Sequence, residues 1–389
     1  MNTQTPSATD FLHLPLAEME ARMARFEAQV NAAQRAAPPS KAWVRQALKR
    51  QGPGRCPVRL KRLSLDVVLR HDQALADLFC QYPDEVVALI PYDFAIGYQD
   101  PGRQPRINPI LAMTQQREWV DEWGTRWGHA FGGVGATPVD YPLKNWDQLD
   151  QYLEQLPDPL APGRLDSILP LFEMHRADRY CIGVIHLVLF ERLHCLRSME
   201  DLFADFYTSE KPLRRLLDAL AAYALKLIRR WGELGADAIF LTDDWGSQTG
   251  LMISPAMWRD FFRDHYQTLF AEAHRRGMEV IFHSCGRVMD IVDELIELDL
   301  DVLDPVQPGA MDLDEVARSF GGRVSFSGAV DLQRLFLSTP SQIRDEVRRT
   351  LDTLGRGFGG GLLAGPANVL TPEVPIENLQ ALFAACHEV

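Results

Sequence analysis

The feature that most constrains the fold is the regular alternation of short apolar runs and amphipathic segments in the second half of the chain. The run Ala236–Thr242 (ADAIFLT) is typical of a parallel strand that is buried on both faces. Ser254 and Pro255 then favour the start of a helix, and Gly277 favours its end. The strand and helix segments that follow alternate in this order: Glu279–Phe282, Val288–Leu298, Val302–Leu303, Leu313–Phe320, Val324–Ser327, Pro340–Leu354, Gly361–Ala364 and Ile376–His387. This alternation predicts a parallel sheet with helices as crossovers.

The number of strands decides between a closed barrel and an open, doubly wound sheet. Three earlier segments are candidate strands: Val86–Ile90, Leu169–Phe172 and Val184–Phe190. They bring the total close to eight, which favours a barrel. No Gly-x-Gly-x-x-Gly follows a strand, so a dinucleotide-binding sheet is not indicated. We therefore predict an α/β protein with a (β/α)8 TIM-type barrel over residues 50–389.

Residues 1–49 are expected to form a helical arm outside this barrel. Leu14–Ala36 contains helix formers with apolar residues three or four positions apart, and Pro38 and Pro39 end the segment. A second helix is expected over Lys41–Arg50.

The stretch from Tyr82 to Leu160 is irregular, so loops, short helices and a hairpin are expected there. Trp119, Trp123 and Trp127 are four residues apart. This spacing predicts one packed face of a helix, and the alternative is a stacking wall for an aromatic ligand. A glycine-rich segment, residues 131–135, lacks the Lys-Ser/Thr of a phosphate-binding loop and is interpreted as a plain loop.

Charge and cysteine usage argue against several classes of function. The formal net charge of −13 gives no electrostatic reason to expect binding to nucleic acid or an anionic membrane. The six cysteines form no CxxC pair and follow no secretory leader, so reduced thiols in a cytoplasm are expected. No apolar run reaches the roughly 18 residues of a membrane span.

In a barrel of this kind, reactive side chains follow the carboxyl ends of the strands. Polar residues occupy that position in five segments: Thr242–Gln248, His283–Gly286, Asp304–Pro308, Ser327–Asp331 and Gly365–Asn368. From these segments we expect substrate contacts from Trp245, Gln248, Gln307 and Asn368.

His283 and Cys285 stand two residues apart at one strand end, so both can project into the barrel mouth. Imidazole and thiolate are preferred ligands of Zn²⁺, and an open coordination position would activate a substrate thiol or oxygen. Two ligands are one fewer than such a site needs. The alternative is a buried Cys285 that acts as a small hydrophobe beside a hydrogen-bonded His283.

Acidic residues at two strand ends are candidates for catalysis. Asp243 and Asp244 are suited to metal binding, to contact with a cationic substrate or to acid–base chemistry. The alternative is that one caps a turn and the other faces water. Glu191, as a catalytic candidate, and Arg192, as a substrate contact, follow another apolar run together with His194. An internal salt bridge is the alternative for these three.

Together these motifs resemble the uroporphyrinogen decarboxylase-like superfamily. In the second half the likeness rests on LTDDWGSQTGLMISPAMWRDFF, VIFHSCGRVMDIVDELIELDLDVLDPVQPGAMD, RVSFSGAVDLQRLF and GLLAGPANVLTPEVPIENL. DEWGTRWG, YPL and FERLHCLRSMEDLFADFY extend it toward the N-terminus. The resemblance implies a distorted (β/α)8 barrel, with either porphyrinogen decarboxylation or methyl transfer linked to cobalamin or a thiol.

The decarboxylases of that superfamily use Arg-Gln-Ala-Gly-Arg-Tyr near the N-terminus and Gly-His-Gly near the C-terminus. Here Arg45-Gln46-Ala47 continues as Leu48-Lys49-Arg50, and Gly365-Pro366-Ala367 stands near the second motif's place. Without those cationic groups, the carboxylates of a tetrapyrrole would be buried unpaired, at a cost of several kcal/mol. The resemblance therefore implies the methyltransferase branch.

That branch binds zinc through His-x-Cys and a distant cysteine. His283-Ser284-Cys285 matches the pair, but Asn368 stands near the place of the distant cysteine. The third ligand would then be Asp243, Asp244 or Glu191, unless this chain has lost the metal.

The expected activity is transfer of a methyl group from a small methoxy- or methylamino-type substrate to a corrinoid protein or a thiol, which demethylates the substrate. No corrinoid-binding module is evident, so a separate partner protein would carry the cobalamin. A homodimer is compatible with this expectation. The alternatives are a lyase or decarboxylase of a small acid, with Asp243 or Asp244 as proton donor, and a non-catalytic small-molecule binder.

Overall fold

The structure is a computed structural model that describes residues 14–52, 54–90, 118–129 and 136–388. The glycine-rich segment 131–135 lies outside these residues. Contacts group the chain into a terminal unit, Met1–Val87 with Pro305–Val389, and a central unit, Ala88–Asp304. Within the described ranges, no helix has the length and apolarity needed to cross a membrane.

The central unit is built on parallel strands whose order follows the chain: β5 (Tyr180–Ile185), β6 (Ala238–Thr242), β7 (Glu279–His283) and β8 (Val302–Asp304). Every residue of β5, β6 and β8 is buried, as expected for strands covered on both faces. The register pairs Thr242 with His283 and His283 with Asp304. These three residues therefore form one row across the ends of neighbouring strands.

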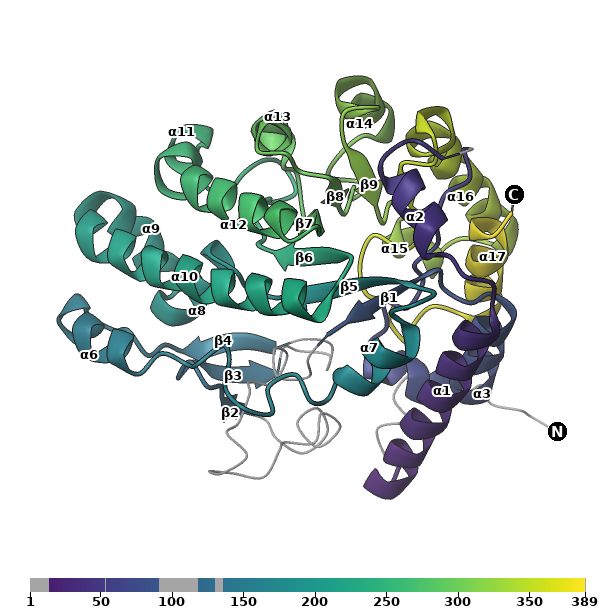
Figure 1. The fold of residues 1–389 in the computed structure, drawn as a ribbon, viewed down its shortest axis with the longest axis horizontal. Helices are drawn as coiled ribbons and strands as arrows, with labels where there is room; N and C mark the ends of the chain where they lie inside the picture. The colour runs from purple at the N-terminus through teal and green to yellow at the C-terminus, as the bar shows by residue number, and fades with distance from the viewer. Residues whose placement is uncertain (1–13, 53, 91–117, 130–135, 389) are drawn as a thin grey trace. The chain divides into compact units, whose positions relative to one another are not determined.

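Two helices precede these strands, α6 (Leu149–Glu154) and α7 (Leu169–His175). The helices that separate the strands along the chain are α8 (Phe190–Arg197), α9 (Met199–Thr208), α10 (Glu210–Leu234), α11 (Pro255–Trp258), α12 (Asp264–Arg275) and α13 (Met289–Glu297). Helices α10 and α12 pack against each other, α10 also contacts β5 and α12 contacts β7 (Figure 1). The Ser254 side chain accepts a hydrogen bond from the Met257 backbone, as the predicted cap requires.

Three short strands form a separate antiparallel sheet: β2 (Glu118–Val120), β3 (Arg126–His129) and β4 (Ala136–Asp140). Trp119 is the register partner of Trp127 across β2 and β3, and Trp123 lies in the turn between them. The predicted helix face was wrong, because a tight hairpin also places residues of this spacing side by side. Gly124, with a φ of +84°, supplies the left-handed turn residue.

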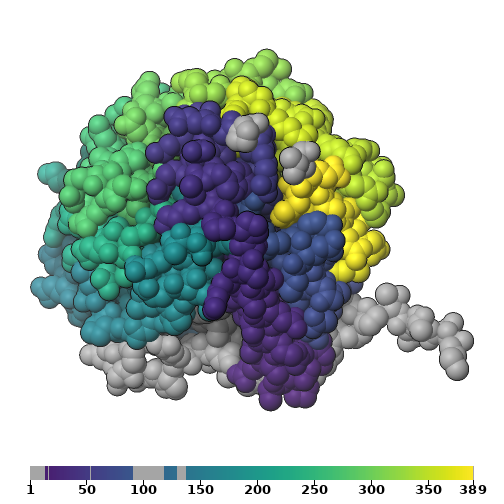
Figure 2. All heavy atoms as spheres, turned by 45° about the vertical axis from the view of Figure 1, so that its right-hand side comes forward, coloured from purple at the N-terminus to yellow at the C-terminus, as the bar shows by residue number. Residues whose placement is uncertain are grey.

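In the terminal unit, α1 (Leu16–Ala36) packs against α3 (Leu65–Gln81), as Figure 2 shows in purple and blue. Phe79 joins the two helices to α17 (Ile376–Cys386), since its ring lies 5.8 Å from that of Phe26 and 4.8 Å from that of Phe383.

The remaining elements of this unit follow the predicted order: α2 (Lys41–Leu48), α14 (Leu313–Phe320), β9 (Ser325–Ser327), α15 (Leu332–Leu335), α16 (Pro340–Leu354) and β10 (Leu362–Leu363). Strands β9 and β10 are parallel neighbours. Thr339 and Gln342 close a capping box at the start of α16.

Apart from the antiparallel sheet of β2, β3 and β4, the strands paired within each unit are parallel neighbours that follow one another in the chain and are separated by helices. This is the (β/α)8 barrel architecture in distorted form, so the predicted fold class is confirmed. Strand β1 (Val86–Leu89) matches the first predicted strand and spans the boundary of the units. The division into an arm of residues 1–49 and a barrel of residues 50–389 stays a prediction.

Two predicted strands were wrong or misplaced. Leu169–Phe172 is the start of helix α7, with Pro170 in its first turn. A short apolar run of this kind does not distinguish a strand from a buried helix. The strand expected at Val184–Phe190 lies earlier, at Tyr180–Ile185, because the apolar run continues through a turn into α8.

Candidate metal centre

The candidate centre is built on the row of strand ends in the central unit. His283 is the last residue of β7, and Cys285 follows it by two positions. Asp244 follows the end of neighbouring strand β6 by two positions. Because parallel strands present their carboxyl ends at one edge of a sheet, the three side chains meet.

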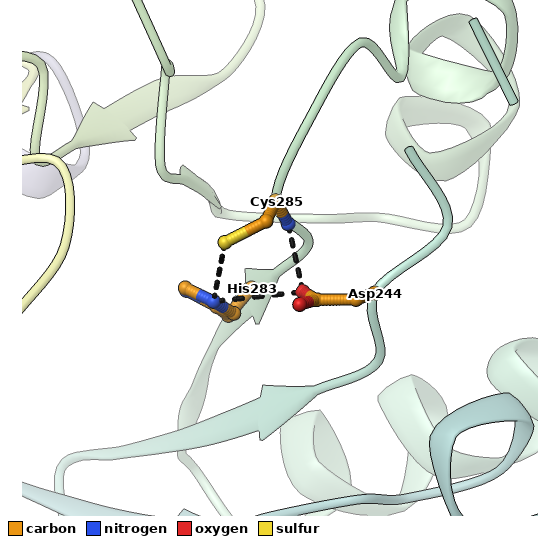
Figure 3. A group of neighbouring side chains, drawn as sticks. All are labelled: Asp244, His283 and Cys285. Atoms are coloured by element: carbon orange, nitrogen blue, oxygen red, sulfur yellow. Dashed lines mark hydrogen bonds and ion pairs between the residues drawn. The ribbon is translucent and has the colours of Figure 1, made fainter. Parts of the chain in front are cut away.

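Asp244, His283 and Cys285 point toward one another (Figure 3), with one ligand atom of each within 4.8 Å of the others. Cys285 Sγ lies 3.4 Å from His283 Nε2, and His283 Nε2 lies 3.7 Å from Asp244 Oδ1. The Cys285 backbone N–H also donates to Asp244 Oδ1 over 2.8 Å. This contact fixes the carboxylate beside the thiol and imidazole.

A buried aspartate orients the imidazole. Asp304 Oδ1 lies 2.5 Å from His283 Nδ1, and the Asp304 side chain is fully buried. With its proton on Nδ1, the ring presents the Nε2 lone pair to Cys285 and Asp244. An imidazole held in this way by a carboxylate is the usual support of a zinc-binding histidine.

The three donor atoms fit a zinc ion. Tetrahedral zinc, with bonds of about 2.0–2.3 Å, places a nitrogen and an oxygen ligand about 3.3 Å apart and a nitrogen and a sulfur ligand about 3.5 Å apart. Two of the three separations, 3.4 and 3.7 Å, are close to that requirement, and the third pair of ligand atoms lies within 4.8 Å. Over the described residues, no other group of three His, Cys, Asp or Glu side chains comes this close. Three protein ligands leave one position for a substrate atom, as in catalytic rather than structural zinc sites.

Asp243, next to the cluster in sequence, has a different environment. Its fully buried carboxylate accepts backbone N–H groups of Leu189, Phe190 and Glu191 over 3.1, 2.9 and 2.7 Å. Tyr266 donates its hydroxyl to the same group. Burial raises the pKa of Asp243 to about 6. These contacts tie the first turn of α8 to the end of β6.

Glu191, in that first turn, lies close to the cluster. Its carboxyl accepts a hydrogen bond from Thr242 Oγ1 over 3.0 Å. Burial, together with the negative charges of Asp244 and Asp243, raises the pKa of Glu191 well above its ordinary value. This environment favours the protonated carboxyl relative to the carboxylate.

The other candidate residues of the central unit lie in different environments. Trp245 is fully buried, donates its indole N–H to Tyr266 over 2.9 Å and stacks on Phe190. Its predicted substrate contact stays a prediction, although the packed indole is fully buried here. Gln248 is exposed in the following turn. His194 is half-buried, and burial lowers its pKa to about 4.

Gln307 and Asn368 belong to the terminal unit. Gln307 is half-buried, and its backbone carbonyl accepts from Met311 over 3.0 Å. Asn368 is exposed, and its side-chain oxygen accepts from the Val369 backbone over 2.7 Å. Their roles in substrate binding stay predictions.

Sequence reasoning assigned no role to Asp304 or Tyr266. Asp304 was among the strand-end residues of the sequence analysis. Its position at the end of the strand that follows His283 could have indicated a contact between the two side chains. Tyr266 lies within helix α12 and carried no comparable signal.

Comparisons with known proteins place these observations in context. The family model of uroporphyrinogen decarboxylase (URO-D) matches residues 193–389, which include the three residues of the cluster. The uroporphyrinogen decarboxylase of Pseudomonas fluorescens Pf-5 is 28% identical over 196 residues, 48% of this chain and 51% of that protein. That of Legionella pneumophila strain Lens is 25% identical, over 50% of this chain and 53% of its own length. The chain thus spans about half the length of the curated relatives it matches.

Among solved structures, a methyltransferase from Methanosarcina mazei has a TM-score of 0.61 at 18% identity. The match covers 90% of this chain and 98% of that one. At this identity the likeness supports the fold alone.

Proposed function

The chain belongs to the uroporphyrinogen decarboxylase (URO-D) family, and we propose that it is a zinc-dependent methyltransferase within it. The observation that carries the proposal is the cluster of Asp244, His283 and Cys285, with its donor spacing and one position left for substrate. A set of one sulfur, one nitrogen and one oxygen donor suits zinc far better than magnesium or calcium. Departures from both decarboxylase motifs add support.

In this proposal His283, Cys285 and Asp244 hold the metal. Bound zinc would supply Lewis-acid activation of a substrate oxygen, nitrogen or sulfur. Asp304 keeps the His283 proton on Nδ1, so that the Nε2 lone pair would bind the metal. Glu191 holds a proton on its carboxyl and passes it to the oxygen or nitrogen that loses the methyl group. Asp243 positions the turn that carries Glu191.

The proposed substrate is a small methoxy- or methylamino-type molecule. The proposed acceptor is a corrinoid on a partner protein or a thiol, and this part rests on the family resemblance alone. A cytoplasmic location and a homodimer likewise remain predictions.

A second candidate function is decarboxylation of a small carboxylic acid. Its support is the likeness to uroporphyrinogen decarboxylases together with the raised pKa of Glu191, which suits a proton donor. A non-catalytic binder on the same scaffold is the third option, and it requires neither metal nor turnover.

The test begins with the metal content of protein purified under reducing conditions. We expect about one zinc per chain in the wild type and in Cys80→Ala, a control at an exposed cysteine, and little in Cys285→Ala. Methyl transfer from methoxy and methylamino compounds is then followed by the absorbance of added cob(I)alamin and by thiol methylation. Cys285→Ala should be inactive but folded.

Two results would reject the proposal. Metal-free wild-type protein together with full activity of Cys285→Ala would remove this cluster from the mechanism. Robust formation of coproporphyrinogen from uroporphyrinogen, which we do not expect, would favour decarboxylation instead.

A further inference from the structure

The central unit contains a narrow, partly enclosed hollow beside helix α8. Its walls are mostly apolar and include Trp123, Ile185 and Leu220. Three polar side chains also line it: His186, which directly follows β5, Arg192 from α8 and Tyr223 from α10. The hollow therefore combines an apolar wall with hydrogen-bond donors.

Arg192 is a buried cation with incomplete pairing. Its side chain is 5% exposed, and its guanidinium stacks 4.4 Å from the centre of the Trp123 ring. Its one ion pair within the described chain is a 3.5 Å contact from Nη1 to Asp121. Nε is buried and has no hydrogen-bond partner there. A buried guanidinium ordinarily has its donors satisfied and its charge matched by a close anion.

Asp121 does not compensate this charge fully, because other donors already occupy it. Its carboxylate accepts the backbone N–H groups of Trp123 and Thr125 and the indole N–H of Trp127, each over 2.9 Å. The contact with Arg192 is the longest of the four. Arg192 thus keeps donor capacity beyond this pair.

Tyr223 adds a second such donor. Its residue is 8% exposed, and its hydroxyl has no hydrogen-bond partner among the described residues. The ring packs edge-on against Trp123, with centroids 4.8 Å apart. Arg192 Nε and the Tyr223 hydroxyl, on different helices, therefore belong to residues that line one hollow, and neither atom has a hydrogen-bond partner among the described residues.

We propose that Arg192 and Tyr223 form a subsite for one carboxylate group of the substrate. A carboxylate accepts two parallel N–H bonds from a guanidinium and a further bond from a hydroxyl, which satisfies the unused donors. The apolar wall suits a short hydrocarbon segment next to it. The proposal rests on the proposed function and narrows its substrate class to small carboxylic acids that carry the methylated oxygen or nitrogen.

A chain of contacts joins the subsite to the candidate metal centre. Leu187, in the wall of the hollow, donates its backbone N–H to Thr242 Oγ1 over 2.9 Å. Thr242 in turn donates to Glu191, the residue before Arg192. The first turn of α8 thus carries both a group of the centre and a group of the subsite.

The experiment measures binding of 3-methoxypropanoate and its uncharged amide, 3-methoxypropanamide, by ligand-observed NMR and calorimetry. The protein is used both zinc-loaded and after chelation. We expect the wild type to prefer the carboxylate at least tenfold. Tyr223→Phe, which keeps the ring, should weaken carboxylate binding about tenfold and leave amide binding unchanged. Arg192→Gln should remove the preference.

Tyr152→Phe is the matched control, because the Tyr152 hydroxyl already donates to the Trp123 carbonyl over 2.8 Å. It should bind the carboxylate like the wild type. Equal binding of carboxylate and amide by the wild type, or an unchanged carboxylate affinity in Tyr223→Phe, would overturn the subsite and leave the hollow as a water site. Tyr223→Phe keeps the test decisive if Arg192→Gln fails to fold.

Failure of the subsite and failure of the proposed function give different results. Retained carboxylate preference without zinc or methyl transfer would reject the function and keep the subsite. Methyl transfer from neutral substrates, without any carboxylate preference, would keep the proposed function and reject the subsite.

Discussion

Asp304 Oδ1 lies 2.5 Å from His283 Nδ1, and the two residues are register partners on neighbouring strands β8 and β7. The fully buried carboxylate therefore sets which imidazole nitrogen is available to a metal.

Asp304→Asn should weaken zinc binding by roughly 10- to 100-fold, because a neutral amide holds the imidazole less strongly in this orientation. Competition with a chelator of known affinity measures the change. Asp301→Asn is the control, since Asp301 pairs with His274 over 2.7 Å, away from the cluster. Equal zinc affinity in the two variants would show that Asp304 has no role in metal binding.

Asp243→Asn and Asp244→Asn should have opposite consequences. Asp243 accepts four hydrogen bonds in the core, so its replacement should cost about 2–3 kcal/mol of unfolding free energy. Asp244 is half-buried, so its replacement should reduce zinc content with little loss of stability. Urea denaturation and metal analysis of both proteins check this. The assignment fails if both variants lose stability alike.

Glu191→Gln should lower kcat by about 10²- to 10⁴-fold, because the amide cannot release the proton that the carboxylic acid holds. Zinc content and the unfolding midpoint should stay close to those of the wild type, since an amide can still accept from Thr242. Steady-state kinetics under the methyl-transfer assay measure the effect. An unchanged kcat would exclude Glu191 as the proton donor.

The pair of His274 and Asp301 should make stability depend on pH. The hydrogen bond to Asp301 raises the pKa of His274 above 6.5, with Asp299 and Glu279 adding attraction for the proton. A raised histidine pKa stabilises the fold below the unfolded-state value, and this stabilisation is lost as pH rises through the folded-state pKa. Because the pair is about one third exposed, the loss between pH 6 and 8 should be below about 1 kcal/mol. Denaturation at several pH values should show it in the wild type and not in His274→Gln, and superimposed profiles would show that the pair contributes nothing.

The later strands and helices were predictable because each carries its own local signal. Thr339 and Pro340 start α16 at the predicted residue, and the apolar run at β6 is buried as expected. The proximity of Asp244, His283 and Cys285 also followed in part, since strand ends meet at one edge of a parallel sheet.

Features that depend on tertiary contacts were not predictable. Nothing local separates Asp243 from Asp244, and only the position of the first turn of α8 gives them different partners. The tryptophan spacing fitted a helix as well as a hairpin. The placement of Arg192 and Tyr223 around one hollow depends on how α8 and α10 are arranged, which no local pattern encodes.

Glu191 and Arg192 are consecutive residues in the first turn of α8. Neighbouring residues on an α-helix project about 100° apart, so these two side chains cannot reach the same place. The distance between the Glu191 carboxyl and the Arg192 guanidinium is thus fixed by the backbone of the first turn of α8. An acid one methylene too short or too long would anchor at one end and miss the other, so substrate length would be selected by backbone geometry.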